Sequence, residues 1–247
     1  MPVENDQLPL YRAYPYMFEA KARVEAVTEE GLVVLDRVLF YPAGGGQPGD
    51  VGALMLGGRT LRVADAVKIP LGTGTGVGLV LAEGETPPEP GEEGTQTLDE
   101  DRRRRHMRMH TALHLLSVVI PLPVTGGQIG ADKGRLDFDM PEAPGDKEAL
   151  QAALDALVAA DHPVSEEWIA DAELDANPGL VKTMSVQPPR GSGKIRLVRI
   201  GTAETPVDLQ PCGGTHVRST AEIGRAVIGK IEKKGRQNRR VSLTLED

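Results

Sequence analysis

Two histidines four residues apart could bind one metal ion together. They lie in the segment His110-Thr111-Ala112-Leu113-His114. In an α-helix, residues i and i+4 project from the same face, so both imidazoles can reach one ion. Thr, Ala and Leu stand between them, so the segment lacks the glutamate base of an HExxH metalloprotease. His106 lies one turn earlier, but it follows the run Arg102 to Arg105, and we expect it on the surface.

The only cysteine of the chain begins a second candidate ligand pair, Cys212-Gly213-Gly214-Thr215-His216. The glycines allow a sharp turn, so that thiolate and imidazole can converge. Sulfur and imidazole nitrogen are the ligands that zinc prefers, in a tetrahedron of four. The two motifs together predict a Zn²⁺ site formed by His110, His114, Cys212 and His216.

Two other interpretations of Cys212 compete with a metal site. A lone cysteine is often a small buried apolar residue, although Pro211 before it and polar residues after it argue against a core position. A Cys-His pair can also be a nucleophile and its base, which would leave the two histidines of the first motif without a task. For a metal ligand, an outer carboxylate could come from Asp137, Asp139 or Asp208, and surface placement is an equal alternative for each.

The segment that carries the first motif is predicted to be a helix over residues 99–120. Thr97 or Asp99 can cap its start, and Pro121 with Pro123 ends it. Apolar residues recur along it at spacings of four, three and four, in Met109, Leu113, Leu116 and Ile120.

The residues before this helix predict an all-β domain. Short β-branched segments are separated by glycine-rich turns, at residues 32–35, 38–41, 51–56, 61–67 and 77–81. A small antiparallel barrel buries such strands without open edges. Residues 83–94, rich in proline and glutamate, are expected to form an exposed loop before a last strand at 95–98. We therefore expect a barrel domain over residues 1–100.

The second domain, over residues 101–247, is predicted to mix helices and strands. An amphipathic helix is expected from Asp146 to Ala160, with four buried residues, Leu150, Leu154, Leu157 and Val158. Residues 195–245 read mostly as strand, with a hairpin around the turn Gly235 to Asn238. The predicted fold class is α+β: an N-terminal antiparallel β-barrel followed by an α+β domain with the zinc site.

The segment Gly44-Gly45-Gly46-Gln47-Pro48-Gly49 formally matches GxGxxG. Pro48 interrupts it and a strand pattern follows, whereas a dinucleotide site requires a helix there, so we predict no nucleotide cofactor. Two interpretations stay open. The segment is a turn between strands, or it lets a ligand approach the backbone closely.

Charge is distributed unevenly along the 247 residues. The 28 Lys and Arg against 36 Asp and Glu give a net charge of −8, which argues against a uniformly nucleic-acid-binding or membrane-binding surface. Residues 218–240, however, hold eight basic and two acidic residues, a net charge of +6. Arg102 to Arg105 and Arg108 form a second basic cluster. Both clusters flank the candidate ligands, which suggests a polyanion held mainly by phosphate contacts, because aromatic residues make up only 3%.

The compartment also follows from composition. A single cysteine excludes an internal disulfide framework and suits a reducing environment. No apolar run approaches the roughly 20 residues that span a bilayer, and the first residues do not resemble a secretory signal. We expect a cytoplasmic protein without a membrane partner, and the sequence predicts no particular oligomeric state.

Taken together, these motifs resemble the alanyl-tRNA editing family, of the free-standing AlaX type. The resemblance is to the longer form, because the short form lacks the barrel and its GGGQ segment. The matching stretches are residues 40–48, 107–116, 212–217, 222–224 and 235–241.

The resemblance implies a zinc-dependent hydrolase that acts in trans on mischarged tRNA(Ala). Its substrate would be Ser-tRNA(Ala), with Gly-tRNA(Ala) as a second candidate, and the bond cleaved is the aminoacyl ester. His110, His114, Cys212 and His216 match the zinc ligands of the family. Gln128 matches a glutamine region lining the amino-acid pocket, and the candidate catalytic residues are Gln128, Thr111 and Thr215. The candidate tRNA contacts are Gly44, Gly45, Gly46, Gln47, Arg225, Lys233, Lys234, Arg236, Arg239 and Arg240.

Two alternatives to this function remain. The first is a non-catalytic RNA-binding module in which zinc is purely structural. The second is a metal hydrolase of small molecules, which the paired basic clusters disfavour. Four protein ligands also close a tetrahedral site, whereas a catalytic zinc keeps one position open. Either one ligand is loose, or the ion becomes five-coordinate, or zinc mainly orients the substrate.

Overall fold

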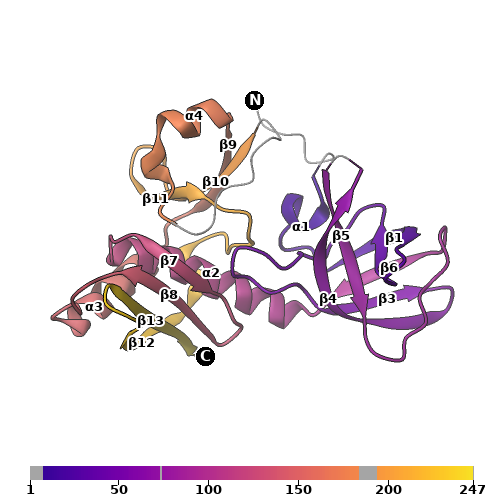
Figure 1. Ribbon diagram of the computed structural model, residues 1–247, viewed down its shortest axis with the longest axis horizontal. Helices are drawn as coiled ribbons and strands as arrows, with labels where there is room; N and C mark the ends of the chain where they lie inside the picture. The colour runs from indigo at the N-terminus through magenta and orange to yellow at the C-terminus, as the bar shows by residue number, and fades with distance from the viewer. Residues whose placement is uncertain (1–7, 73, 184–193, 247) are drawn as a thin grey trace. The chain divides into compact units, whose positions relative to one another are not determined.

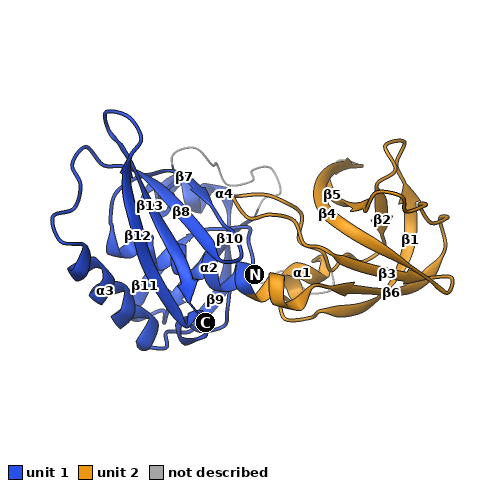
Figure 2. Cartoon of the chain, turned by 90° about the horizontal axis from the view of Figure 1, so that it is seen from below, with its two compact units in different colours: residues 1–2, 105–247 blue, residues 3–104 orange. Residues whose placement is uncertain are grey.

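The computed structural model describes residues 8–72, 74–183 and 194–246. The chain forms two compact units. Among the described residues, the first unit ends at Arg104 and the second begins at Arg105 (Figure 2). The first unit is a closed antiparallel barrel, and the second combines two antiparallel sheets with helices. The predicted α+β fold with an N-terminal barrel is confirmed.

The barrel has six strands in the order β1-β2-β5-β4-β3-β6. Strands β1, β3, β4, β5 and β6 are labelled in Figure 1. A short helix, α1 (Leu10–Ala13), precedes it. Apolar side chains of alternate strand positions fill the interior, including Val24, Leu54, Leu61 and Leu79. The strands are β1 (Glu19–Val27), β2 (Val33–Leu35), β3 (Gly52–Leu56), β4 (Arg59–Leu71), β5 (Gly74–Leu81) and β6 (Glu93–Leu98).

One predicted strand of the barrel is wrong. Residues 38–41 are fully buried but form no strand. Buried side chains replace a neighbouring strand as hydrogen-bond partners: Gln96 Oε1 accepts from the Leu39 amide at 2.8 Å, and Asp50 Oδ2 accepts from the Tyr41 amide at 2.6 Å. A buried apolar run can thus be irregular when side chains satisfy its backbone.

The glycine-rich segment of the barrel is a tight turn. Gly44 and Gln47 exchange two backbone hydrogen bonds of 3.0 Å, and Gly45 and Gly46 between them have φ angles of +60° and +84°. Two consecutive positive φ angles favour glycine. A Cβ on Gly44 would lie 2.7 Å from Nζ of Lys68. Gly45 and Gly46 therefore have a structural reason, whereas at Gly44 the flexible end of Lys68 could move away.

The second unit contains two sheets. The four-stranded sheet has the order β12-β13-β8-β7, and the three-stranded sheet has the order β11-β10-β9. The strands are β7 (Val124–Gln128), β8 (Lys133–Asp139), β9 (Val164–Ile169), β10 (Ile195–Gly201), β11 (Pro206–Pro211), β12 (Arg225–Lys233) and β13 (Asn238–Glu246). The helices are α2 (Glu100–Val119), α3 (Lys147–Ala159) and α4 (Asp171–Ala176), with 3-10 turns at Pro178–Leu180 and Thr220–Ile223. None of the described helices is long and apolar enough to cross a membrane.

Helix α2 forms as predicted. The Asp99 side chain accepts a hydrogen bond of 3.0 Å from the Arg102 amide, so Asp99 is the cap. The four residues of the predicted apolar stripe are all buried. His106, however, is only 1% exposed, so its predicted surface position is wrong. It lies one turn before His110 and therefore on the same buried face.

The hairpin and the helix of the second domain are also found. β12 pairs with β13 around the predicted turn. Helix α3 is capped by Asp146, whose side chain accepts from the Ala149 amide at 2.9 Å. Of its four expected core residues only Leu154 is buried, and the other three are half-exposed.

The basic cluster before the metal motif does not form one cationic surface. The Arg103 side chain is 0% exposed and Asp50 is 2% exposed, and they form an ion pair inside the barrel unit. Arg103 Nε lies 3.1 and 3.0 Å from the two Asp50 oxygens, and the guanidinium also donates to the carbonyls of Pro15 and Leu39. Three other members have partners of their own: Arg104 pairs with Glu100, Arg105 pairs with Asp132, and Arg108 donates to the carbonyl of Ile223.

We predict that Arg103→Met destabilises the protein by about 3–5 kcal/mol, because it leaves the Asp50 carboxylate buried without its cation. Arg104→Met on the same helix is the matched control. It breaks an exposed ion pair with Glu100 and the cation–π contacts with the rings of Tyr16 and Phe18, and it should cost about 1–2 kcal/mol. Urea unfolding measures both free energies, and equal small losses would contradict a structural role for Arg103.

Candidate metal centre

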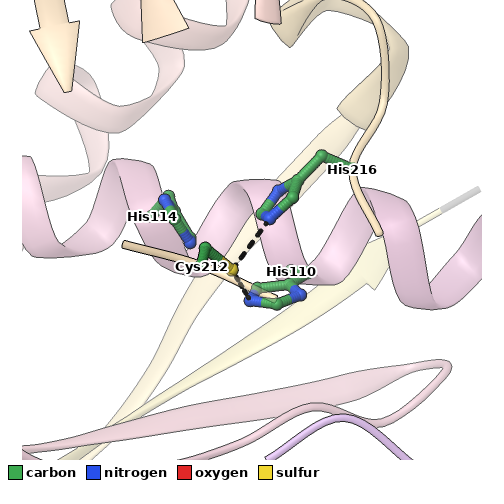
Figure 3. A group of neighbouring side chains, drawn as sticks. All are labelled: His110, His114, Cys212 and His216. Carbon is green, nitrogen blue, oxygen red and sulfur yellow. Dashed lines mark hydrogen bonds between the residues drawn. The ribbon is translucent and has the colours of Figure 1, made fainter. Parts of the chain in front are cut away.

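Four side chains from two distant parts of the chain converge on one point (Figure 3). The ligand atoms of His110, His114, Cys212 and His216 all lie within 4.8 Å of one another. Cys212 Sγ lies 3.4 Å from Nε2 of His110 and 3.2 Å from Nε2 of His216. The three histidines are only 6–7% exposed. The group could hold a metal ion.

Helix α2 supplies two of the four residues. His110 and His114 are one turn apart, and their ring centroids lie 5.2 Å from each other. The ring of His216 lies 4.2 Å from that of His110 and 4.6 Å from that of His114, so it completes a triangle of imidazoles. The i and i+4 spacing therefore does what the sequence predicts.

The loop after β11 supplies the other two residues. The guanidinium of Arg196, on β10, donates to the carbonyl of Cys212 at 2.6 Å and to the carbonyl of Gly214 at 3.1 Å. Glu166 accepts from the same guanidinium at 2.5 Å. The Gly214 amide donates to Cys212 Sγ, at 3.4 Å.

A hydroxyl group fixes the ring of His216. Thr111 Oγ1 donates its only hydrogen to the carbonyl of Met107, at 3.0 Å. It therefore acts as acceptor toward His216 Nδ1, 3.1 Å away, which assigns the proton of the neutral ring to Nδ1. The lone pair of His216 Nε2 is then directed at the group.

A carboxylate fixes the ring of His114. Asp208 Oδ2 lies 2.9 Å from His114 Nδ1 and accepts from Gln210 Nε2 at 2.7 Å. An ionised carboxylate only accepts hydrogen bonds, so His114 Nδ1 carries a proton and Nε2 faces the other ligands. Of the three candidate outer carboxylates, Asp208 is the one that contacts a member of the group.

Burial, neighbouring charges and hydrogen bonds shift the pKa values of three members of this group. Burial raises the pKa of Cys212, but the imidazoles of His110 and His216 outweigh it and hold the pKa of the thiol well below its usual value. Burial lowers the pKa of His114, but hydrogen bonds to Asp208 and Cys212 outweigh it and raise the pKa to about 9. Burial and the neighbouring His110 lower the pKa of His216 to about 3. The lowered pKa of Cys212 favours the thiolate that a metal ligand needs, whereas the raised pKa of His114 means that this ring would release a proton on binding a metal.

The three candidate catalytic residues have different surroundings. Thr111 is completely buried and acts on the group through His216. Thr215 is buried directly before His216. Gln128 lies outside the group, on the exposed end of β7, where its Oε1 accepts from Arg135 Nε at 3.2 Å.

The candidate tRNA contacts of the second unit divide into two sets. Lys233, Lys234 and Arg236 are exposed around the β12–β13 turn, and only Lys234 has an acidic neighbour among the described residues, Glu232 at 3.7 Å. The other three are committed to partners: Arg225 to Glu246 at 3.0 Å, Arg239 to the carbonyl of Pro141 at 2.7 Å and Arg240 to Asp137 at 2.8 Å.

The sequence did not point to three residues that hold the ligand residues or their partners in place: Lys182, Arg196 and Gln210. Lys182 Nζ lies 2.5 Å from Asp208 Oδ1. For Gln210 a signal was present, because Asp208 and Gln210 alternate in a strand directly before Cys212 and so share one face. For Lys182 and Arg196 nothing in the local pattern distinguishes them from ordinary surface cations.

Comparison with known proteins agrees with this architecture. A family model described as threonyl and alanyl tRNA synthetase second additional domain matches residues 195–242. The alanyl-tRNA editing protein AlaX-M of Methanosarcina acetivorans is 34% identical, over 96% of this chain and 98% of the relative. AlaX-M of Methanosarcina barkeri is 36% identical with the same coverage. Alanine–tRNA ligase of Pyrobaculum aerophilum is 38% identical over 91% of this chain but only 25% of the ligase. The chain therefore belongs to the AlaX-M family of alanyl-tRNA editing proteins.

Proposed function

We propose that this protein is a zinc-dependent hydrolase that edits mischarged tRNA(Ala) in trans, in the cytoplasm. Its substrate is Ser-tRNA(Ala), with Gly-tRNA(Ala) as a second candidate. Water splits the ester that joins the amino acid to the terminal ribose, and free amino acid and deacylated tRNA result. The observation that carries this proposal is the buried convergence of three imidazoles and one thiolate. Similarity to AlaX-M proteins over nearly the whole chain supports the substrate class.

The donor set supports zinc as the ion. Zinc prefers imidazole nitrogen and thiolate sulfur in a tetrahedron. With bonds of about 2.0–2.1 Å to nitrogen and 2.3 Å to sulfur, a tetrahedral ion needs sulfur-to-nitrogen separations of about 3.5 Å. The separations of 3.4 and 3.2 Å around Cys212 Sγ are close to that value. His110, His114, Cys212 and His216 are therefore the proposed ligands.

We assign different roles to the residues around this centre. A bound zinc ion would polarise the ester carbonyl or lower the pKa of a water molecule. Thr111 keeps Nε2 of His216 directed inward, which makes it a positioning residue rather than a catalytic one. Gln128 and Thr215 are the proposed contacts to the aminoacyl group, Gln128 from the exposed end of β7.

Discrimination requires a second site of this kind. Serine differs from alanine by one hydroxyl group, and a pocket made for alanine cannot strongly reject a side chain that merely adds one. At a hydrolytic site the same hydroxyl allows recognition, because a polar group can hydrogen-bond to it and alanine has no hydroxyl. Correctly charged Ala-tRNA(Ala) is then spared.

Phosphate contacts would hold the tRNA. The exposed cations Lys233, Lys234 and Arg236 are the proposed contacts of the second unit. In the barrel unit, the proposed contact is the turn Gly44 to Gln47, of which Gly45 and Gly46 are exposed.

Replacing a ligand should abolish editing. We expect Cys212→Ala and His216→Ala each to lower kcat/KM for Ser-tRNA(Ala) hydrolysis by more than about 100-fold, since losing an outer partner of a ligand alone costs 10–100-fold. His162→Ala replaces a histidine outside the group and serves as control. Release of labelled serine measures the rate, and near-normal rates for Cys212→Ala would remove Cys212 from the centre.

Metal removal distinguishes an enzyme from a zinc-stabilised RNA-binding module. A chelator should abolish hydrolysis while circular dichroism shows a folded protein, and added Zn²⁺ should restore the rate. A purely structural ion predicts unfolding of the second unit on chelation, and no hydrolysis of charged tRNA before it.

The hairpin cations should set the salt dependence of tRNA binding. The triple variant Lys233→Ala, Lys234→Ala, Arg236→Ala is expected to bind tRNA(Ala) more weakly and to reduce the slope of log K against log salt by about 3, or about 1 for each phosphate that the variant no longer touches. Lys147→Ala, an exposed cation at the start of α3, is the control and should leave the slope unchanged. An unchanged slope in the triple variant would show that the hairpin does not touch phosphate.

A further inference from the structure

Asp208 is a buried carboxylate directly behind the metal centre. Its side chain is 0% exposed. Oδ2 faces Nδ1 of His114 at 2.9 Å and Nε2 of Gln210 at 2.7 Å, and Oδ1 accepts from Nζ of Lys182 at 2.5 Å. A buried charge is tolerated only when it is paired and hydrogen-bonded, and both oxygens of Asp208 meet that condition.

The three donors come from different parts of the second unit. His114 belongs to α2, and Gln210 shares β11 with Asp208. Lys182 lies in a segment attached to the four-stranded sheet, because its carbonyl accepts from the Val124 amide at 3.0 Å and Thr183 forms a parallel bridge with Val124. Asp208 thus joins the helix that carries two ligands to elements of both sheets.

We propose that Asp208, with Lys182 as its counter-ion and Gln210 as a brace, is the positioning cluster that sets the metal affinity of this centre through His114. The inference rests on the proposed function. It gives these three residues, none of which is a proposed ligand, the role of orienting the ligand His114. A ligating histidine is oriented by the acceptor on its other ring nitrogen, and a carboxylate there strengthens the ligand.

Lys182 has a separate role in this cluster. Without it, the Asp208 charge would be met only by an imidazole N–H and an amide N–H, both neutral donors when the metal is bound. The Nζ at 2.5 Å supplies a full opposite charge and fixes the second carboxylate oxygen. Because the Lys182 side chain is 29% exposed, it can be changed with little effect on packing.

The test is the affinity of the chelator-treated full-length protein for Zn²⁺, measured by competition with a chromophoric chelator and without tRNA. Asp208→Asn keeps the shape of the side chain but removes its charge, and we expect it to weaken Zn²⁺ binding about 10–100-fold. Asp137→Asn is the matched control. Asp137 pairs with Arg135 and Arg240 but contacts no ligand of the centre, so this variant should bind Zn²⁺ like the unchanged protein.

A second pair of variants keeps the inference testable if Asp208→Asn does not fold. Lys182→Met removes the counter-ion and should weaken Zn²⁺ binding, whereas Lys182→Arg keeps the charge and should restore most of the affinity. Circular dichroism of each metal-free variant verifies the fold. A folded Asp208→Asn with an unchanged Zn²⁺ affinity, or equal affinities for Lys182→Met and Lys182→Arg, would overturn the proposal.

The same measurements separate this inference from the proposed function. A protein whose Zn²⁺ affinity depends on Asp208 but which does not hydrolyse Ser-tRNA(Ala) supports the positioning cluster and refutes the editing activity. An unchanged protein that binds no Zn²⁺ overturns the metal centre and the cluster together. Hydrolysis lost in Asp208→Asn with its Zn²⁺ affinity intact would contradict the cluster and leave editing in place.

Discussion

A metal ion accepts its ligand atoms only within about 0.2 Å of their ideal distances, so side chains that meet from distant parts of a chain need to be fixed from outside. In this protein Asp208 faces Nδ1 of His114, and Thr111 faces Nδ1 of His216. Arg196 holds two carbonyls of the loop that carries Cys212. Each contact uses an atom that points away from the centre. Ordinary hydrogen bonds therefore direct three of the four donor atoms, those of His114, Cys212 and His216, toward one another.

Helix α2 serves both units of the chain. Near its start Arg103 is buried against Asp50 in the barrel unit, and further along His110 and His114 belong to the group that could hold a metal ion. Of the arginines near these positions in the sequence, Arg104, Arg105 and Arg108 pair with carboxylates or carbonyls of the protein. Three exposed cations, Lys233, Lys234 and Arg236, lie close together around the β12–β13 turn. In a chain with a net charge of −8, they form a local concentration of positive charge.

The failures of sequence reasoning have a common cause. Residues 38–41 look like a strand, but the side chains of Gln96 and Asp50 take the place of a neighbouring strand. His106 and Arg103 look exposed because they stand among charged residues, yet the face of α2 on which they lie is buried. Leu39 and Arg103 have partners far away in the chain, Gln96 and Asp50. The order of apolar and polar residues indicates the periodicity of a helix or strand, but it does not indicate which other parts of the chain cover each face.

Spacing and residue type determined the metal group itself, because a helix puts residues i and i+4 on one face whatever its surroundings, and glycines allow the cysteine loop to turn. Apolar periodicity likewise determined helix α2, the hairpin and most barrel strands. Only the tertiary structure decided which partners fix the ligands, Asp208, Thr111 and Arg196 among them, and which cations stay exposed. The physical reason is that hydrogen bonds and ion pairs between distant segments depend on how the sheets and α2 pack, whereas local spacing can only narrow the candidates, as it did for Asp208.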